Sequence, residues 1–92
     1  MKNKFDVVKY LKINGDSIVS LKDNEHHCVT TDFNNKYVKS RNTKKIPMEK
    51  SKVLVFSWTA NEFINLSVAD ITKIVPLSEI LKNEGMPEGV II

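Results

Sequence analysis

The feature that most constrains the fold is the stretch Val53–Val75, which holds the only long apolar run and the single tryptophan of the chain. Val53–Trp58 is rich in β-branched and aromatic residues, which favour strands because they pack well on a pleated surface. Phe63–Val68 alternates apolar and polar residues, as a strand does when one of its faces is buried. The four residues between these segments are typical of a turn. The stretch therefore predicts two strands joined by a tight turn, followed by a short bend and a third strand over Ile71–Val75.

Three further strands are expected in the first half of the chain, the last two of them joined as a hairpin. Ser17–Leu21 and His26–Phe33 are predicted strands, and the polar connection Lys22–Glu25 between them has the residue types of a turn. Asn34-Asn35 suits another tight turn, because asparagine tolerates positive φ. Lys36–Arg41 is therefore predicted to be a short return strand.

The segment Phe5–Ile13 supports two interpretations. Its apolar residues fall near helical spacing, and Asn14-Gly15 then supplies the C-terminal cap of a helix. Alternatively, apolar and polar residues roughly alternate, and Asn14-Gly15 is the two-residue turn of a hairpin into the next strand. The hairpin is favoured, because Asn-Gly is the strongest short hairpin signal and β-branched residues prefer strands.

The C-terminal part predicts a strand end, a short helix and a tail. Pro76 ends the last strand because proline lacks a donor for the ladder, and Ser78 is expected to cap a helix that runs through Lys82. Residues 84–92 contain two glycines and a proline and are predicted to form a flexible tail. Residues 1–83 are predicted to form one domain. Five or six short strands at intervals of about 8–12 residues predict a mainly β protein, either a small barrel or a sandwich.

Composition limits the class of protein. With 41% apolar and 27% charged residues the chain is expected to fold, and no apolar run approaches the roughly 20 residues that span a bilayer, so no membrane partner is expected. A single cysteine and no signal-peptide pattern predict a cytoplasmic location. The lysine, asparagine and isoleucine content is typical of AT-rich genomes, including those of some bacteria and phages. A domain this small buries only about 60–65% of its unfolded surface, so a partner or a homo-oligomer can supply part of its stability.

The most informative functional feature is an uneven distribution of charge. Between Lys36 and Lys52 lie seven cations and one acid, a segment charge of +6, whereas the rest of the chain has a charge of −3. Such a cluster attracts polyanions, because each phosphate that it neutralises releases condensed counterions. An aromatic ring at the surface adds stacking on an exposed base. The predicted nucleic-acid-binding residues, in a segment that includes the loop Asn42–Lys52, are Lys36, Tyr37, Lys39, Arg41, Lys44, Lys45, Lys50 and Lys52.

The same residues also have interpretations that involve no nucleic acid. The basic segment also fits a solvated lysine loop or a site for an acidic protein surface, and Arg41 is the only arginine available for specific phosphate recognition. Trp58, with Phe56 and Phe63 across the turn, fits either the core or a ligand platform. The core is favoured, because aromatic residues contribute the largest buried area to a small domain.

Residues that could act as metal ligands or nucleophiles cluster just before and within the predicted strand His26–Phe33. His26 and Cys28 share one face of that strand, which is the start of either a zinc site or a nucleophile pair. No second Cys/His cluster completes a metal site, and neither a glycine-rich phosphate loop nor a hydrolase motif is present. The sequence therefore predicts no metal, no cofactor and no enzymatic activity, with Cys28 as a small core residue.

The pattern over Val53–Ile74 resembles a known class of domains. An apolar strand, an aromatic residue and a turn are followed by F-x-x-L-x-x-x-D-I-x-x-I, which is similar to the closing strands of small SH3-like and Sm-like barrels, and in particular to the end of WYL domains. Val53-Leu54-Val55-Phe56 stands in place of the Trp-Tyr-Leu signature, and Asn61-Glu62 stands where an arginine precedes the phenylalanine. The ligand residues of that family are therefore not carried over.

The resemblance implies a small SH3-like or Sm-like barrel of about five or six short strands with a short C-terminal helix. It also implies the tendency of such barrels to bind nucleic acid, nucleotides or proteins. The sequence thus predicts a non-enzymatic binding or regulatory module that binds RNA or DNA through its basic segment. The alternative is a small protein-interaction module, either a phage- or bacterium-encoded modulator of a host protein or a self-assembling subunit.

Overall fold

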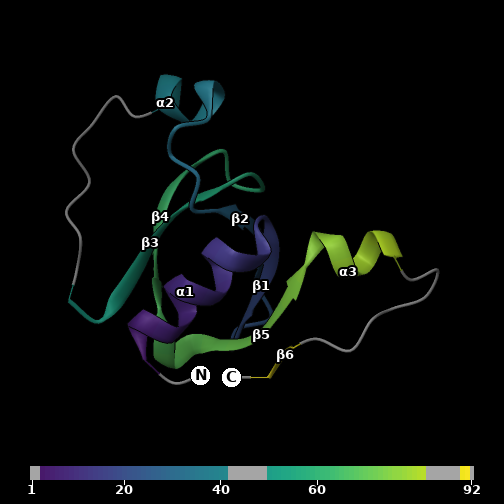
Figure 1. The fold of residues 1–92 in the computed structure, drawn as a ribbon. Helices are drawn as coiled ribbons and strands as arrows, with labels where there is room; N and C mark the ends of the chain where they lie inside the picture. Colours follow the sequence, from purple (N-terminus) through teal and green to yellow (C-terminus); the bar gives the residue numbers. More distant parts are fainter. Residues whose placement is uncertain (1–2, 42–49, 83–89, 92) are drawn as a thin grey trace.

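The five longer strands form one curved antiparallel sheet, and helix α1 lies across its inner face (Figure 1). The computed structural model describes residues 3–41, 50–82 and 90–91. The strand order is β4-β3-β2-β1-β5-β6. The strands are β1 (Ser17–Leu21), β2 (His26–Thr30), β3 (Lys52–Ser57), β4 (Glu62–Ser67), β5 (Ile71–Pro76) and the two-residue β6 (Val90–Ile91). The helices are α1 (Lys4–Asn14), α2 (Lys36–Arg41) and α3 (Leu77–Lys82), with a 3₁₀ turn, η1 (Val68–Asp70), between β4 and β5.

The sheet confirms the predicted mainly β class and the arrangement of its closing strands. β3 and β4 form the expected hairpin, in which Val53 pairs with Leu66 and Val55 with Ile64. After η1, β5 returns to pair with β1, so that β1 lies between β2 and β5. The sheet is not a closed barrel, since β4 and β6 are its outer strands in the described part of the chain.

The favoured hairpin at Phe5–Ile13 is wrong, because this segment is helix α1. Asn3 caps the helix by accepting the backbone N–H of Asp6 on its side-chain oxygen at 2.9 Å. Gly15 follows the last turn with φ of 76°, and its N–H donates to the carbonyl of Leu11 at 2.9 Å. Val7 and Leu11, four residues apart on one face, are fully buried against the sheet. Their burial outweighs the strand preference of the segment, and Asn14-Gly15 ends a helix instead of joining two strands.

The predicted return strand Lys36–Arg41 is also wrong, because these residues form helix α2. The side-chain oxygen of Asn35 accepts the N–H groups of Tyr37 and Val38 at 2.9 and 3.3 Å, as the N-cap of a helix does. Val38 is fully buried and holds α2 on the domain. The preceding strand stops at Thr30, earlier than predicted, because the Thr30 hydroxyl accepts the N–H of Asp32 and turns the backbone.

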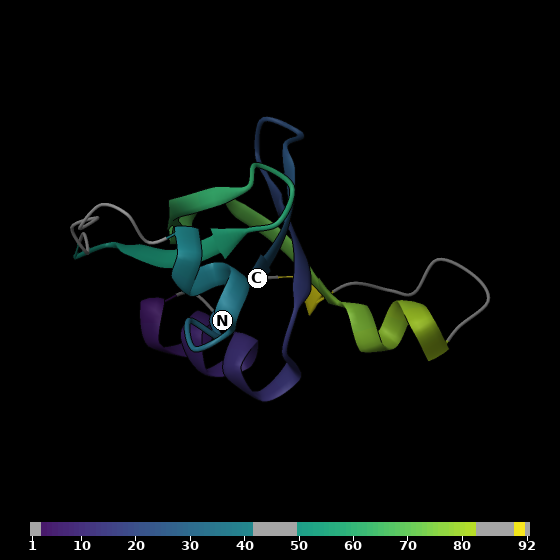
Figure 2. The same ribbon diagram turned by 90° about the horizontal axis from the view of Figure 1, so that it is seen from above.

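The C-terminal part agrees with the sequence in outline. The short helix α3 is present, but it begins at Leu77, whose N–H donates to the Asp16 carbonyl at 3.0 Å, so Ser78 is not its cap. α3 projects away from the sheet in both views (Figure 2). Val90–Ile91 pairs with β5, while residues 84–89 and 92 of the predicted tail lie outside the described ones. None of the helices in the described ranges is long and apolar enough to cross a membrane.

Two alanine substitutions on α1 discriminate a helix from a hairpin. Leu11 is 1% exposed and Ile13 is 71% exposed. We expect Leu11→Ala to lower the free energy of unfolding by about 2–5 kcal/mol, because it leaves a cavity in the core. Ile13→Ala is expected to change it by less than about 0.5 kcal/mol. Urea unfolding of both variants measures the difference. Equal losses would contradict the helix, since the hairpin places both residues on one buried face.

Candidate functional site

The structure divides the predicted basic segment into separate parts. Lys36, Tyr37, Lys39 and Arg41 lie on α2 at one end of the sheet, whereas Lys50 and Lys52 lie at the start of β3, at the other end (Figures 1 and 2). Lys44 and Lys45 fall in 42–49, outside the described residues. The described members of the segment therefore do not form one surface.

Helix α2 presents three exposed cations, Lys36, Lys39 and Arg41, and contains no acidic residue. It has only six residues, so its position depends on what it contacts. The Asn35 cap fixes its first turn, and the buried Val38 side chain fixes its inner face. The three cations and Tyr37 are exposed on the rest of the helix surface.

The Tyr37 ring is held in place while 43% of the residue remains exposed. It stacks on Trp58 with ring centroids 5.8 Å apart and an interplanar angle of 28°, and it meets Phe56 edge-on at 6.2 Å. Its hydroxyl donates to the side-chain oxygen of Asn61 at 2.7 Å and accepts from Arg41 Nη2 at 2.9 Å. The guanidinium carbon of Arg41 lies 5.1 Å from the Tyr37 ring centroid, a cation–π distance. The Tyr37 ring and the Arg41 guanidinium are thus held in contact with each other.

Trp58 is half-buried in an aromatic cluster that lies outside the core covered by α1. Its ring packs edge-on against the buried Phe56 at 5.1 Å, and its indole N–H donates to Asp16 Oδ2 at 3.2 Å. The other side of Phe56 meets Phe63 at 5.2 Å. Phe56 and Phe63, which pair across β3 and β4, lie outside the core cluster, and the half-buried Trp58 supports Tyr37.

A serine, a histidine and a carboxylate come together that the sequence analysis did not identify. His27 Nδ1 lies 2.9 Å from Ser57 Oγ, and His27 Nε2 lies 3.4 Å from Glu25 Oε2. The order of groups resembles a hydrolytic triad. However, Ser57 is 0% exposed and its Oγ already accepts the N–H of Ala60 at 3.0 Å, so a substrate carbonyl has no access to it. The arrangement fixes the β3–β4 turn.

The pair His26 and Cys28 is not joined into a site. His26 Nδ1 bonds Ser20 Oγ at 2.7 Å across the β1–β2 pair. Burial raises the pKa of the Cys28 thiol, and the negative charge of Asp16 raises this pKa further. A reactive cysteine requires the opposite shift. Across residues 3–41, 50–82 and 90–91, no group of three or more His, Cys, Asp or Glu side chains is placed to hold a metal ion.

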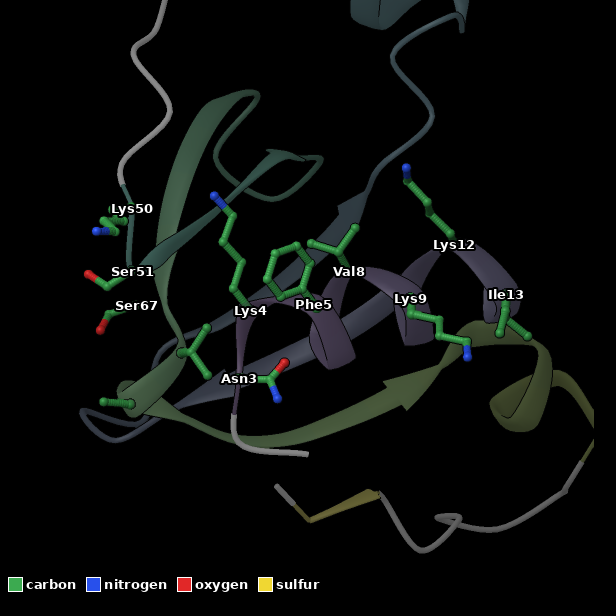
Figure 3. Close-up of a pocket in the computed structure, with 12 residues that line it drawn as sticks. Asn3, Lys4, Phe5, Val8, Lys9, Lys12, Ile13, Lys50, Ser51 and Ser67 are labelled. Atoms are coloured by element: carbon green, nitrogen blue, oxygen red, sulfur yellow. The ribbon is translucent and has the colours of Figure 1, made fainter.

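A groove along α1 is a second surface that the sequence analysis missed (Figure 3). One wall is the outer face of α1, and the other is formed by the residues before β3, the end of β4 and η1. Its volume is about 1260 Å³. Of the predicted binding residues within the described part of the chain, only Lys50 lines it, together with Lys4, Lys9 and Lys12 of α1. The outer face of α1 could be predicted from a helical spacing, which is that of Phe5, Lys9, Lys12 and Ile13. The favoured hairpin did not use this spacing, so the groove was not predicted.

The raised pKa of Cys28 gives a pH-dependent prediction. Only the thiolate reacts with iodoacetamide, so a raised pKa means less thiolate and slower alkylation at any given pH than for a free cysteine, whose pKa is about 8.5. We expect the rate–pH curve of the folded protein to have its midpoint above that value. Asp16→Asn removes the charge but keeps an acceptor for Trp58, and is expected to move the midpoint down. A folded-state midpoint at or below that of the urea-unfolded chain would contradict this.

Comparison with known proteins gives no relative from which a role can be transferred. No family model, no curated protein and no solved structure matches the chain. The function is therefore argued from the geometry of α2 and of the groove.

Proposed function

We propose that this protein is a non-enzymatic binding module that binds single-stranded RNA or DNA at α2. The observation that supports the proposal is the Tyr37 ring, which is stacked on Trp58 and 43% exposed beside Lys36, Lys39 and Arg41. Successive bases of a single strand stack on such rings, and the backbone phosphates follow the neighbouring cations. A duplex hides its base faces, so a single strand is the better ligand for this surface.

Preorganisation strengthens this assignment. The two hydrogen bonds of the Tyr37 hydroxyl, to Asn61 and from Arg41, fix the ring before any ligand arrives. A side chain that is already ordered loses less conformational entropy on binding. Arg41 adds a planar donor group that suits phosphate, whereas Lys36 and Lys39 act as point charges. The surface is therefore suited to sequence-tolerant binding.

We also propose that the open sheet is a variant of the SH3-like or Sm-like barrel. The support is the succession of five short antiparallel strands, the 3₁₀ turn before β5, and the return of β5 to β1, which curves the sheet around one core. Because such a fold alone does not fix a ligand, the binding proposal rests on the α2 surface and not on the fold. A cytoplasmic location suits both the nucleic-acid ligand and the free thiol of Cys28.

Fluorescence anisotropy with single-stranded oligonucleotides at several salt concentrations tests the nucleic-acid proposal. Three phosphate contacts predict a slope of about −2 for the logarithm of the binding constant against the logarithm of salt. Tyr37→Ala is expected to weaken binding about 5- to 150-fold, because base stacking contributes about 1–3 kcal/mol. Tyr37→Phe keeps the ring and is expected to lose less. Lys39→Glu/Arg41→Glu is expected to abolish binding at physiological salt.

The matched control is Lys9→Glu/Lys12→Glu, which makes the same change of charge on α1, away from α2. We expect this control to bind oligonucleotides with nearly wild-type affinity. No binding by the wild-type protein at low salt would refute the proposal. An equal loss in the two double variants would refute the assignment to α2, because only net charge would then matter.

A further inference from the structure

The outer face of α1 leaves two large apolar side chains in solvent. Phe5 is 84% exposed and Ile13 is 71% exposed, and the third exposed large hydrophobic residue among those described is Tyr37 of the α2 surface. Neither Phe5 nor Ile13 belongs to the core cluster, to which α1 contributes Val7 and Leu11 from its opposite face. Large apolar side chains exposed on one face of a helix are a common feature of interaction sites in soluble proteins.

These side chains border a groove whose dimensions suit a polypeptide segment. Phe5 and Val8 lie on the α1 side, while Lys50, Ser51 and Ser67 lie across from them (Figure 3). Val68 and Ala69 of η1 complete the apolar lining. The volume of about 1260 Å³ exceeds the roughly 300–1,000 Å³ of small-molecule sites. An amphipathic helix laid alongside α1 fills a groove of this kind, with its apolar stripe against Phe5, Val8 and Ile13.

The charge of the groove is of one sign among the residues that the structure describes. Four of the described lining residues are lysines, Lys4, Lys9 and Lys12 from α1 and Lys50 from the opposite wall, and none of them is acidic. Lysine stems extend over apolar surface while their ammonium groups stay in water, so they add to the apolar contact as well as to the charge. A segment with carboxylates on either side of an apolar stripe is complementary to this arrangement.

We infer that the groove between α1 and η1 is a docking site for an acidic amphipathic helix of a partner protein. It lies apart from the α2 surface and does not depend on nucleic-acid binding there. Nucleic acid fits the groove less well, because the described lining residues include five apolar ones and only three neutral polar ones that could hydrogen-bond to base edges. A second copy docked α1 against α1 brings lysines of like charge together. A membrane surface is nearly flat and does not enter a groove.

A peptide selection tests this inference. A library of random peptides about 16 residues long is displayed on phage and selected on the wild-type chain, after depletion on Phe5→Ala/Ile13→Ala, which removes the exposed apolar groups and no core contact. We expect the selected peptides to be rich in glutamate and aspartate, with apolar residues three or four apart. In anisotropy measurements, the Phe5→Ala/Ile13→Ala variant is expected to bind the best peptide about tenfold more weakly, as loss of a central apolar contact does.

Charge variants supply the second arm of the test. Lys9→Glu/Lys12→Glu is expected to weaken peptide binding about tenfold and to reduce its salt dependence, whereas Lys39→Glu/Arg41→Glu on α2 is expected to leave it unchanged. Thermal unfolding of each variant shows that the fold is kept. Selection of no peptide, or of neutral or basic ones, overturns the inference.

Other occupants of the groove give distinct results. The wild-type chain is sedimented alone, with phosphatidylserine vesicles and with single-stranded RNA. Self-association, vesicle binding or RNA binding that is lost in Phe5→Ala/Ile13→Ala but kept in Lys39→Glu/Arg41→Glu overturns the proposed helical partner and assigns the groove to that occupant. Failure of RNA binding at α2 leaves the peptide results unaffected, so the two proposals fail separately.

Discussion

The packing of Val7 and Leu11 against the sheet is the interaction on which the rest of the structure depends. It joins α1 to Val19, Val29, Val53, Val55 and Ile74, which come from four different strands. A sheet of short strands needs such a cover, because its inner face is apolar and cannot remain in water. The same packing decides which side of α1 faces outward, and thereby creates the groove with its exposed Phe5 and its lysines.

A second constraint comes from the aromatic residues at the β3–β4 end of the sheet. Phe56 is buried outside the core cluster that α1 covers and contacts Phe63, Trp58 and Tyr37, so this ring anchors the surface of α2 to the sheet. A helix of six residues has little stability of its own in water. Its place is set by the burial of Val38 and by the stack of Tyr37 on Trp58. The groove therefore depends on the core cluster under α1, whereas the α2 surface depends on a separate aromatic cluster around Phe56.

The sequence predictions were right where a structure depends on neighbouring residues and wrong where it depends on contacts between distant parts of the chain. The β-branched and aromatic content of β3, the alternation in β4 and the proline at the end of β5 are local properties, so these strands were predicted well. Asn14-Gly15 is compatible with both a hairpin turn and a helix end, and the choice depended on whether Val7 and Leu11 had a sheet to pack against. The choice between helix and strand at Lys36–Arg41 also depended on long-range packing, because its helix is held by the burial of Val38 and by the Asn35 cap. The groove was missed for this reason, because it exists only when α1 is a helix.

The sequence by itself determined that the chain forms a β-rich domain, where most of its strands lie, and that cations concentrate between Lys36 and Lys52. These are properties of composition and of patterns that span a few residues. Only the tertiary structure decided where that charge lies, with α2 at one end of the sheet and Lys50 at the other, beside the lysines of α1. The net charge of a segment can be summed from its sequence, but a binding surface requires charged residues that lie close together in space. The long-range pairing of strands decides which residues do so. The stack of Tyr37 on Trp58 joins residues 21 positions apart and has no local signal in the sequence.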